Sequence, residues 1–172
     1  MTDQTTDSQT TDSQTTDSQT TGSQTDAQQL FPAGIPRLNH IGLSLPADAL
    51  SAEGRAEILA FYGECFGWNE LPTETLDRTR MVLAVGHWDQ FVFLHADEEP
   101  MNCPRLDHFG VSVQSRADLD SAWSRVASWA ERDSRVDVIE PAVDDFEVLK
   151  IHSFYVRFLL PMMVEVQYWE FA

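Results

Sequence analysis

The chain has 172 residues, of which 28 are Asp or Glu and 11 are Lys or Arg, so its net charge is −17. Such an acidic chain is repelled by nucleic acids and by anionic membrane surfaces, which excludes both as partners. No apolar run approaches the roughly 20 residues that cross a bilayer, and two cysteines are too few for a disulfide scaffold, so we expect free thiols in a reducing cytoplasm.

Residues 1–29 form a low-complexity tail. From Thr5 onward they repeat the sequence Thr-Thr-Asp-Ser-Gln, and no apolar residue occurs between Met1 and Ala27. Such a segment cannot bury enough surface to offset the entropy lost on ordering, so the tail is predicted to be disordered. It has neither the basic start nor the apolar stretch of a signal peptide. The remainder, residues 36–172, has the length of one domain.

The first half of that domain predicts a strand, a helix and two more strands. Leu38–Leu45 alternates in the manner of a strand, and Pro46 ends it. Ala47–Trp68 predicts a helix with a loose first turn, and Gly67 is well placed to stop it. The apolar stripe of this helix comprises Ile58, Phe61, Tyr62, Cys65 and Phe66. A hairpin-length loop joins the two strands that complete this half, in the order Arg80–Val85, loop 86–90 and Phe91–His95.

The second half repeats this order after a polar connection over residues 97–104. Ser115–Asp118 is typical of a capping box, so a helix is expected to begin there. Asp144 and Asp145 predict an acidic loop. The expected strands are Leu106–Val113, Val136–Ile139, Lys150–Leu160 and Met162–Phe171, and the apolar face of the helix comprises Leu119, Ala122, Trp123, Val126 and Ala130.

Two segments of nine residues are nearly the same. Arg37–Leu45 returns 68 residues later as Arg105–Val113, with five of the nine positions identical. An internal repeat implies two equivalent structural units, each of which opens on the same strand. The repeat places His40 and His108 at the same position of each unit. A two-fold arrangement could bring both imidazoles toward one point, which predicts a metal site.

Four features occur together in this sequence: the repeated order of elements, the paired histidines, a Glu in the last strand, and the Leu59–Trp68 stretch (Leu-Ala-Phe-Tyr-Gly-Glu-Cys-Phe-Gly-Trp). In these features the chain resembles the vicinal oxygen chelate superfamily. That superfamily includes glyoxalase I, methylmalonyl-CoA epimerase, fosfomycin-resistance transferases, extradiol dioxygenases and bleomycin-resistance proteins. The resemblance covers residues 36–172, with module one over 36–98 and module two over 104–172. It implies an α+β fold in which two βαβββ modules form a curved mixed β-sheet cleft, with the helices outside.

The resemblance also implies a divalent metal ion (Zn, Ni, Mn or Fe) in the cleft, held from the first and last strands of each module. On this chain the matching ligands are His40, His108 and Glu165, with His95 as the fourth. A different register of the hairpin before His95 would put an apolar residue at that position and leave three protein ligands. Family members often pair, so a homodimer is a further expectation.

The residue types support such a site independently of the resemblance. Two imidazoles and one carboxylate are a common divalent-metal set, and they leave positions open for water or substrate. Glu165 lies between two valines, so strand alternation sends its carboxylate to the opposite face, where burial would be costly unless it is paired or coordinating. Glu165 and His152 are the candidate catalytic residues, and Tyr155 and Arg157 share a face that could bind a substrate anion. Ordinary core packing and surface ion pairs remain alternative interpretations of His152 and Arg157.

The sequence therefore predicts a cytoplasmic, metal-dependent, glyoxalase-like enzyme that acts on a small oxygenated substrate. Isomerase or lyase chemistry is one option, in which the metal acts as a Lewis acid. Ring-cleaving dioxygenation is another, because two His and one carboxylate also suit ferrous iron. The alternative from a different class is a metal-free small-molecule binding module of the bleomycin-resistance type, which would not need His40, His108 and Glu165 to converge.

Overall fold

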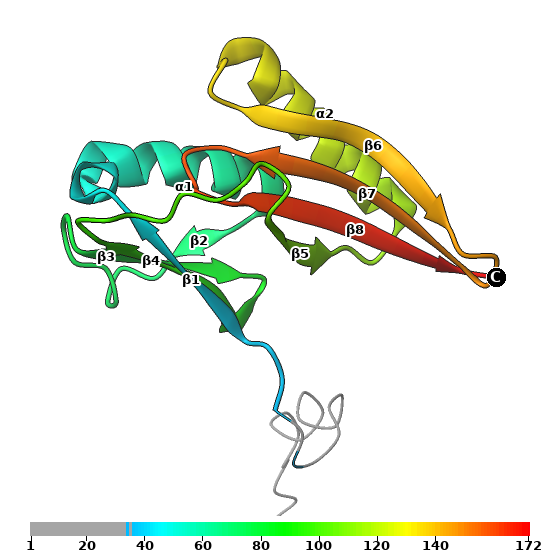
Figure 1. The fold of residues 1–172 in the computed structure, drawn as a ribbon, viewed down its shortest axis with the longest axis horizontal. Coiled ribbons are helices and arrows are strands. Elements are labelled where there is room, and N and C mark those ends of the chain that lie inside the picture. The colour runs from blue at the N-terminus through cyan, green and yellow to red at the C-terminus, as the bar shows by residue number, and fades with distance from the viewer. Residues whose placement is uncertain (1–33, 35) are drawn as a thin grey trace, which may run out of the picture. The chain divides into compact units, whose positions relative to one another are not determined.

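The structure, a computed structural model, describes residue 34 and residues 36–172. The predicted disorder of residues 1–29 lies outside the described residues. All the helices and strands belong to the compact unit Leu38–Ala172, which contains two four-stranded mixed sheets and two α-helices (Figure 1). The predicted α+β class and the two successive modules are confirmed.

The first module forms the sheet β1-β4-β3-β2, in which β1 runs parallel to β4 and the other neighbours are antiparallel. The predicted helix with a loose first turn is present, since a 3-10 turn, η1, begins at Ala47 and the α-helix follows from Ala52. Ser51 caps the α-helix by accepting a hydrogen bond from the N–H of Gly54, and Gly67 ends it at a φ of 71°. The elements are β1 (His40–Leu45), η1 (Ala47–Leu50), α1 (Ala52–Phe66), β2 (Asn69–Glu70), β3 (Arg80–Val85) and β4 (His87–Ala96).

The second module repeats this topology as the sheet β5-β8-β7-β6, with β5 parallel to β8. The predicted capping box is present, since the side chain of Ser115 accepts a hydrogen bond from the N–H of Asp118 at 3.1 Å. The elements are β5 (His108–Ser112), α2 (Arg116–Arg132), β6 (Asp137–Asp145), β7 (Leu149–Arg157) and β8 (Met163–Phe171).

Two predicted loops are wrong. Residues 87–90 belong to β4, because the turn narrows to Gly86 and a bulge between Ala84 and Val85 absorbs the change of register. Asp144 and Asp145 lie in β6, where they pair with Ile151 and Lys150. β6 is an edge strand, and exposed charges are tolerated on such strands because they discourage pairing with other chains.

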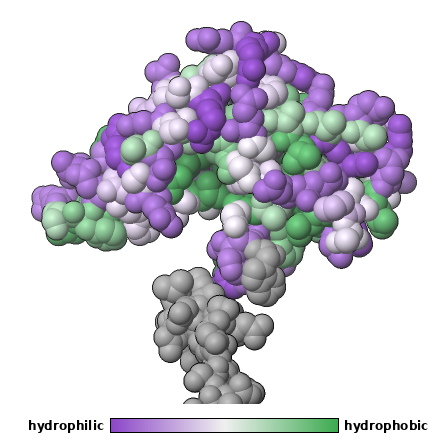
Figure 2. Space-filling model, turned by 180° about the vertical axis from the view of Figure 1, so that it is seen from behind, coloured by the Kyte–Doolittle hydropathy of each residue, from purple (hydrophilic) through white to green (hydrophobic). Residues whose placement is uncertain are grey.

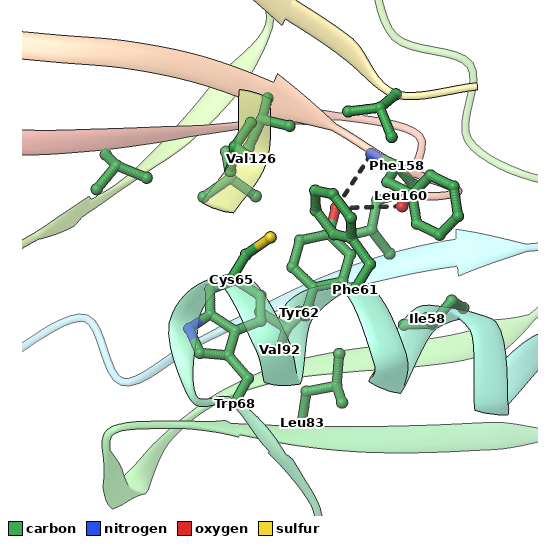
Figure 3. Packing of buried hydrophobic residues seen from close by; sticks show 14 of the residues in the cluster. Ile58, Phe61, Tyr62, Cys65, Trp68, Leu83, Val92, Val126, Phe158 and Leu160 are labelled. Atoms are coloured by element: carbon green, nitrogen blue, oxygen red, sulfur yellow. Dashed lines mark hydrogen bonds between the residues drawn. The ribbon is translucent and has the colours of Figure 1, made fainter. Parts of the chain in front are cut away.

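Helix α1 joins the two modules. Phe61 is fully buried and lies next to Phe158 of the second module (Figure 3), with ring centroids 4.8 Å apart. Its ring centroid is 5.4 Å from that of Trp129, which also belongs to the second module. The hydroxyl of Tyr62 donates a hydrogen bond to the carbonyl of Phe158 at 3.2 Å and accepts one from its N–H at 3.3 Å. A relative movement of the modules would expose this shared core and break buried hydrogen bonds, so the modules are held together as one body.

Exposed large apolar side chains gather at the outer end of the second sheet. They comprise Val143, Phe146, Val148, Trp169 and Phe171 on the β6–β7 hairpin and the end of β8. Figure 2 shows this apolar end at its left edge, next to hydrophilic residues. In the described part of the chain, no helix has both the length and the apolar character that a membrane span requires.

The two thiols lie in different surroundings, and this predicts different reactivity. Burial raises the pKa of the Cys65 thiol to about 12, whereas Cys103 is partly exposed in the connection between the modules. We expect a thiol-reactive disulfide reagent at pH 8 to modify Cys103 in the native protein and Cys65 only after unfolding in urea, because the thiolate is the reacting form. The Cys103→Ser variant should therefore show almost no native reaction, and rapid labelling of that variant would contradict the burial of Cys65.

Candidate functional site

Each sheet has one face covered by helices and one open face. In β8, Val164 and Val166 belong to the core, so Glu165 between them points to the open face. Across the sheet Glu165 pairs with Gly110 of β5 and with Tyr155 of β7. On the open face of the second sheet, Gly110, Glu165 and Tyr155 therefore form one row across three strands.

His108 and Glu165 lie together on this face. The Nε2 atom of His108 is 3.3 Å from Oε2 of Glu165, whose side chain is only 8% exposed. The Nδ1 atom of His108 lies 2.8 Å from the carbonyl oxygen of Leu106, which can only accept, so Nδ1 carries the proton of that bond. In the neutral ring, the lone pair of Nε2 then faces a carboxylate oxygen. Two acceptors at this distance repel unless a proton or a metal ion lies between them.

Tyr155 completes this group. Its ring meets the His108 ring edge to face, with centroids 5.1 Å apart, and it lies opposite Glu165 in the β7–β8 pairing. Burial, together with the neighbouring Glu165 carboxylate, raises the pKa of Tyr155 to about 12. Tyr155 is therefore a neutral phenol over the physiological pH range, and its hydroxyl can donate a hydrogen bond to a carboxylate or a substrate oxygen.

Two guanidinium groups meet one carboxylate at the end of the same sheet. Arg157 donates to Oδ2 of Asp137 at 3.0 Å, and Arg105 donates to Oδ1 at 2.7 Å. Hydrogen bonds and charge from Arg105, with a smaller contribution from Arg157, hold the pKa of Asp137 below its usual range. The predicted substrate-binding Arg157 is thus partly neutralised, but the cluster keeps one excess positive charge. Sequence reasoning missed Arg105 as a site residue, although it is the first residue of the repeat in the second module.

His40 and His95 lie on the first sheet. The ring of His40 stacks on Phe91 with centroids 4.7 Å apart, and the ring of His95 stacks near Phe93 at 5.8 Å. Among the described residues, no three His, Cys, Asp or Glu side chains are close enough to hold one metal ion. The single chain therefore brings His108 and Glu165 together, and it leaves His40 and His95 outside that pair.

The strand register identifies the residue of module one that is equivalent to Glu165. Gly110 pairs with Glu165 in the second module, and the equivalent Gly42 pairs with Phe93 in the first. His95 pairs with Ser44 and thus corresponds to Gln167, which lies two residues beyond Glu165 on β8. In this register the apolar Phe93, and not His95, lies at the position equivalent to Glu165, where the fourth ligand was expected.

His152 lies on the face opposite to Glu165, so it cannot act as a base beside that carboxylate. It belongs to the same strand as Tyr155 but is three residues away, and alternation sends the two side chains to opposite faces. Arg116 donates a hydrogen bond to its Nδ1 at 2.6 Å, and its Nε2 donates to Glu170 at 2.7 Å. The sequence alone could have predicted this, because His152 and the buried Phe154 are two residues apart and therefore point to the same face of β7.

A cavity of about 250 Å³ lies between the first sheet and the edge strand of the second. Its lining includes His40 and Phe91 from the first module, and Gly110 and Ser112 from β5. In the described part of the chain β1 and β5 are both edge strands, with a partner strand on one side only. The repeated strands thus each present a free backbone edge, and each carries one of the repeated histidines.

The fold is similar to that of several solved structures. The chain is similar to a proposed glyoxalase family protein from Bacillus anthracis (19% identity, 80% of this chain and 98% of that chain covered, TM-score 0.54). It is also similar to lactoylglutathione lyase from Agrobacterium tumefaciens (17% identity, 78% of this chain and 94% of that chain covered, TM-score 0.53). A third similar structure is the fosfomycin resistance protein FosX from Listeria monocytogenes (15% identity, 77% of this chain and 90% of that chain covered, TM-score 0.54). At these identities the likeness shows the fold alone. A scan against models of protein families and a search of curated protein sequences found no match.

Proposed function

Because the chain has the fold of the vicinal oxygen chelate superfamily, we propose that it is a divalent-metal-dependent enzyme of the glyoxalase-like type, acting on a small oxygenated substrate by isomerase or lyase chemistry. The observation that carries the proposal is the pair formed by His108 and Glu165. A lone pair and a carboxylate that face each other at 3.3 Å favour a cation between them.

The residues of the second sheet fit a divalent ion. Metal–nitrogen and metal–oxygen bonds of about 2.0–2.2 Å at tetrahedral or octahedral angles separate neighbouring ligand atoms by roughly 3.0–3.5 Å, which includes the observed spacing. The bond from Nδ1 of His108 to Leu106 sets the ring orientation, as is usual for metal-binding histidines. A Cβ at Gly110 would lie 3.8 Å from Oε2 of Glu165, so glycine keeps the space beside that oxygen free.

The third donor in this proposal is His40 of a second copy. Among the described residues, His40 forms no group of three potential ligands with His108 and Glu165 of its own chain, and the shared core around Phe61 opposes a movement of one module toward the other. The free edges of β1 and β5 offer backbone groups for pairing between copies. A homodimer would then contain two equivalent sites, each with His40 from one copy and His108 and Glu165 from the other.

The side chains around this site suit the proposed chemistry. A bound divalent ion would supply Lewis acidity to a substrate oxygen. The neutral phenol of Tyr155 would donate a hydrogen bond to a developing oxyanion, and Arg157 would attract an anionic substrate group. The carboxylate of Glu165 is the group placed to hold a proton during isomerisation. Isomerase or lyase chemistry consumes no oxygen, so substrate-dependent oxygen uptake would instead indicate ring-cleaving dioxygenation.

Metal content tests the proposal directly. We expect the wild-type protein to bind about one zinc, nickel, manganese or iron(II) ion per chain, and His108→Ala and Glu165→Gln to lose at least about 100-fold in affinity, because loss of a ligand costs more than loss of its supporting partner. Elemental analysis and calorimetric titration measure this. His87→Ala and Glu131→Gln serve as matched controls that should bind like the wild type. A wild-type protein that takes up no stoichiometric metal would support the metal-free binding module instead.

Mixing two variants tests whether copies share the site. His40→Ala and Glu165→Ala are each expected to bind no metal alone. After unfolding and refolding together in equal amounts, half of the dimers contain one copy of each, and one of their two sites is intact, so about one quarter of the wild-type metal content should return. His108→Ala mixed with Glu165→Ala is the control that restores nothing. Failure of the first mixture to recover metal would contradict a shared site.

A further inference from the structure

The open faces of the two sheets carry different side chains at equivalent positions, although the two modules have the same topology. Register places Phe93 of the first sheet at the position of Glu165 in the second. On the next strand of the first sheet, Val82 of β3 pairs with Phe93. On the next strand of the second sheet, Tyr155 of β7 pairs with Glu165. The two sheet faces therefore offer different chemistry at equivalent positions, one apolar and aromatic and the other polar and charged.

The first face carries four rings in two stacked pairs. His40 and Phe91 are nearly parallel, with an interplanar angle of 4° and centroids 4.7 Å apart. Phe93 and His95 are 5.8 Å apart with an angle of 25°. The phenylalanines alternate with Val92 and Leu94 of the core, so their rings lie on the open face. Flat rings on a sheet face favour offset stacking with another planar ring.

A glycine leaves an open slot beside these rings. Gly42 lies between His40 and Ser44 on β1 and pairs with Phe93 on β4. A Cβ built at Gly42 would meet no atom within 4 Å, so the space above Gly42 on this face is open. We call this open space the slot of Gly42; on the same face it has His40, a proposed metal ligand, two residues away on β1 and Phe93 beside it on β4.

We infer that the ligand of this site carries a planar aromatic ring next to its oxygen atoms. The ring would lie in the slot of Gly42 against Phe93, while the oxygens would face His108, Glu165 and Tyr155 of the second copy. An anionic group would be drawn toward Arg157. This inference rests on the proposed shared site, and it restricts its ligands to aromatic oxygenated acids or related ring compounds.

Three 2-oxo acids test the inference, because they differ only in the group next to the keto acid. Phenylglyoxylate carries a planar ring, cyclohexylglyoxylate carries a puckered ring of similar size, and pyruvate carries a methyl group. Calorimetric titration of the full-length wild-type protein, with and without added zinc, should show phenylglyoxylate binding at least about tenfold more tightly than pyruvate and several-fold more tightly than cyclohexylglyoxylate.

Two variants locate the ring. Phe93→Ala removes the stacking surface, and Gly42→Leu fills the slot with a side chain, so both should reduce the preference for phenylglyoxylate over pyruvate to less than about threefold. Phe171→Ala removes a phenylalanine that is 71% exposed at the far end of the second sheet, and it should keep the full preference. Gly42→Leu removes no side chain from the sheet, so it still tests the inference if Phe93→Ala folds poorly.

The outcomes separate this inference from the proposed function, because metal content is measured in the same samples. Bound metal with no preference for the aromatic acid, or with no measurable binding of any of the three acids, would overturn the inference and leave the metal site standing. Absence of metal with a preference that Phe93→Ala abolishes would overturn the metal-dependent function and support the aromatic slot. A preference that both variants retain would also overturn the inference.

Discussion

Replacing Phe61 by alanine is expected to lower the free energy of unfolding by about 3–5 kcal/mol. The side chain is fully buried and contacts Tyr62 and Phe66 of its own module as well as Trp129 and Phe158 of the other. Its removal leaves a cavity where the modules meet, and neither module can close that cavity alone. Urea unfolding at fixed protein concentration, followed by tryptophan fluorescence and circular dichroism, measures the loss.

The same experiment tests whether the modules share one core. Both probes should report a single transition in the wild type and in Phe61→Ala, because the contacts of Phe61 span the two modules. Phe171→Ala should change stability by less than about 0.5 kcal/mol, since its side chain is exposed. Two separate transitions in the wild type would contradict the shared core, and with it the reason for assigning His40 to a second copy.

Stability is expected to fall above about pH 10, and two tyrosines are responsible. Complete burial raises the pKa of Tyr62 far above its usual range, and burial with the Glu165 carboxylate raises that of Tyr155 to about 12. In the unfolded chain both phenols ionise near pH 10. Between about pH 10 and 12 the native state therefore binds more protons than the unfolded state, so the free energy of unfolding decreases as pH rises. Cys65, with its pKa raised to about 12, acts in the same direction from about pH 9 upward.

Few other groups obscure this effect, because the sequence contains three tyrosines and Lys150 is its only lysine. Urea unfolding at pH 8, 10 and 11 should show a loss on the order of a few kcal/mol in the wild type. Tyr62→Phe should be less stable at pH 8, since it leaves the N–H and carbonyl of Phe158 without their buried partner, but its stability should depend less on pH. Native tyrosinate absorbance from all three tyrosines at pH 10 would contradict the burial of Tyr62.

Local pattern was sufficient for most of the fold. The repeat of Arg37–Leu45 predicted two equivalent modules, and the modules have the same topology. Gly67 stops the first helix and Ser115 caps the second, as their sequence positions indicated. The errors occurred where pairing with a neighbouring strand overrode local composition: Asp144 and Asp145 were assigned to a loop, but β7 holds them in an edge strand.

The candidate site was only partly readable from sequence. Alternation in Val164-Glu165-Val166 correctly predicted a carboxylate on the open face, because a period of two needs no knowledge of tertiary structure. Counting along β7 could have separated His152 from Tyr155, but the register between β7 and β8 was needed to place Tyr155 opposite Glu165. The fourth ligand position depended on a bulge and a one-residue turn before β4, and no local pattern revealed either.

Spacing along the chain was enough to predict the repeated order of strands and helix in each module, the end of α1 at Gly67, the cap of α2 at Ser115 and the face of Glu165 on β8. It was not enough to predict how strands and helices that are distant in sequence pack together. The pairing of β5 with β8 brings His108 and Glu165 together, and the packing of α1 against Trp129 and Phe158 holds the first module, which carries His40, in its place beside them. Such contacts join residues that are distant in sequence, so they depend on how whole helices and strands pack. The same repeated strands are compatible with more than one such packing.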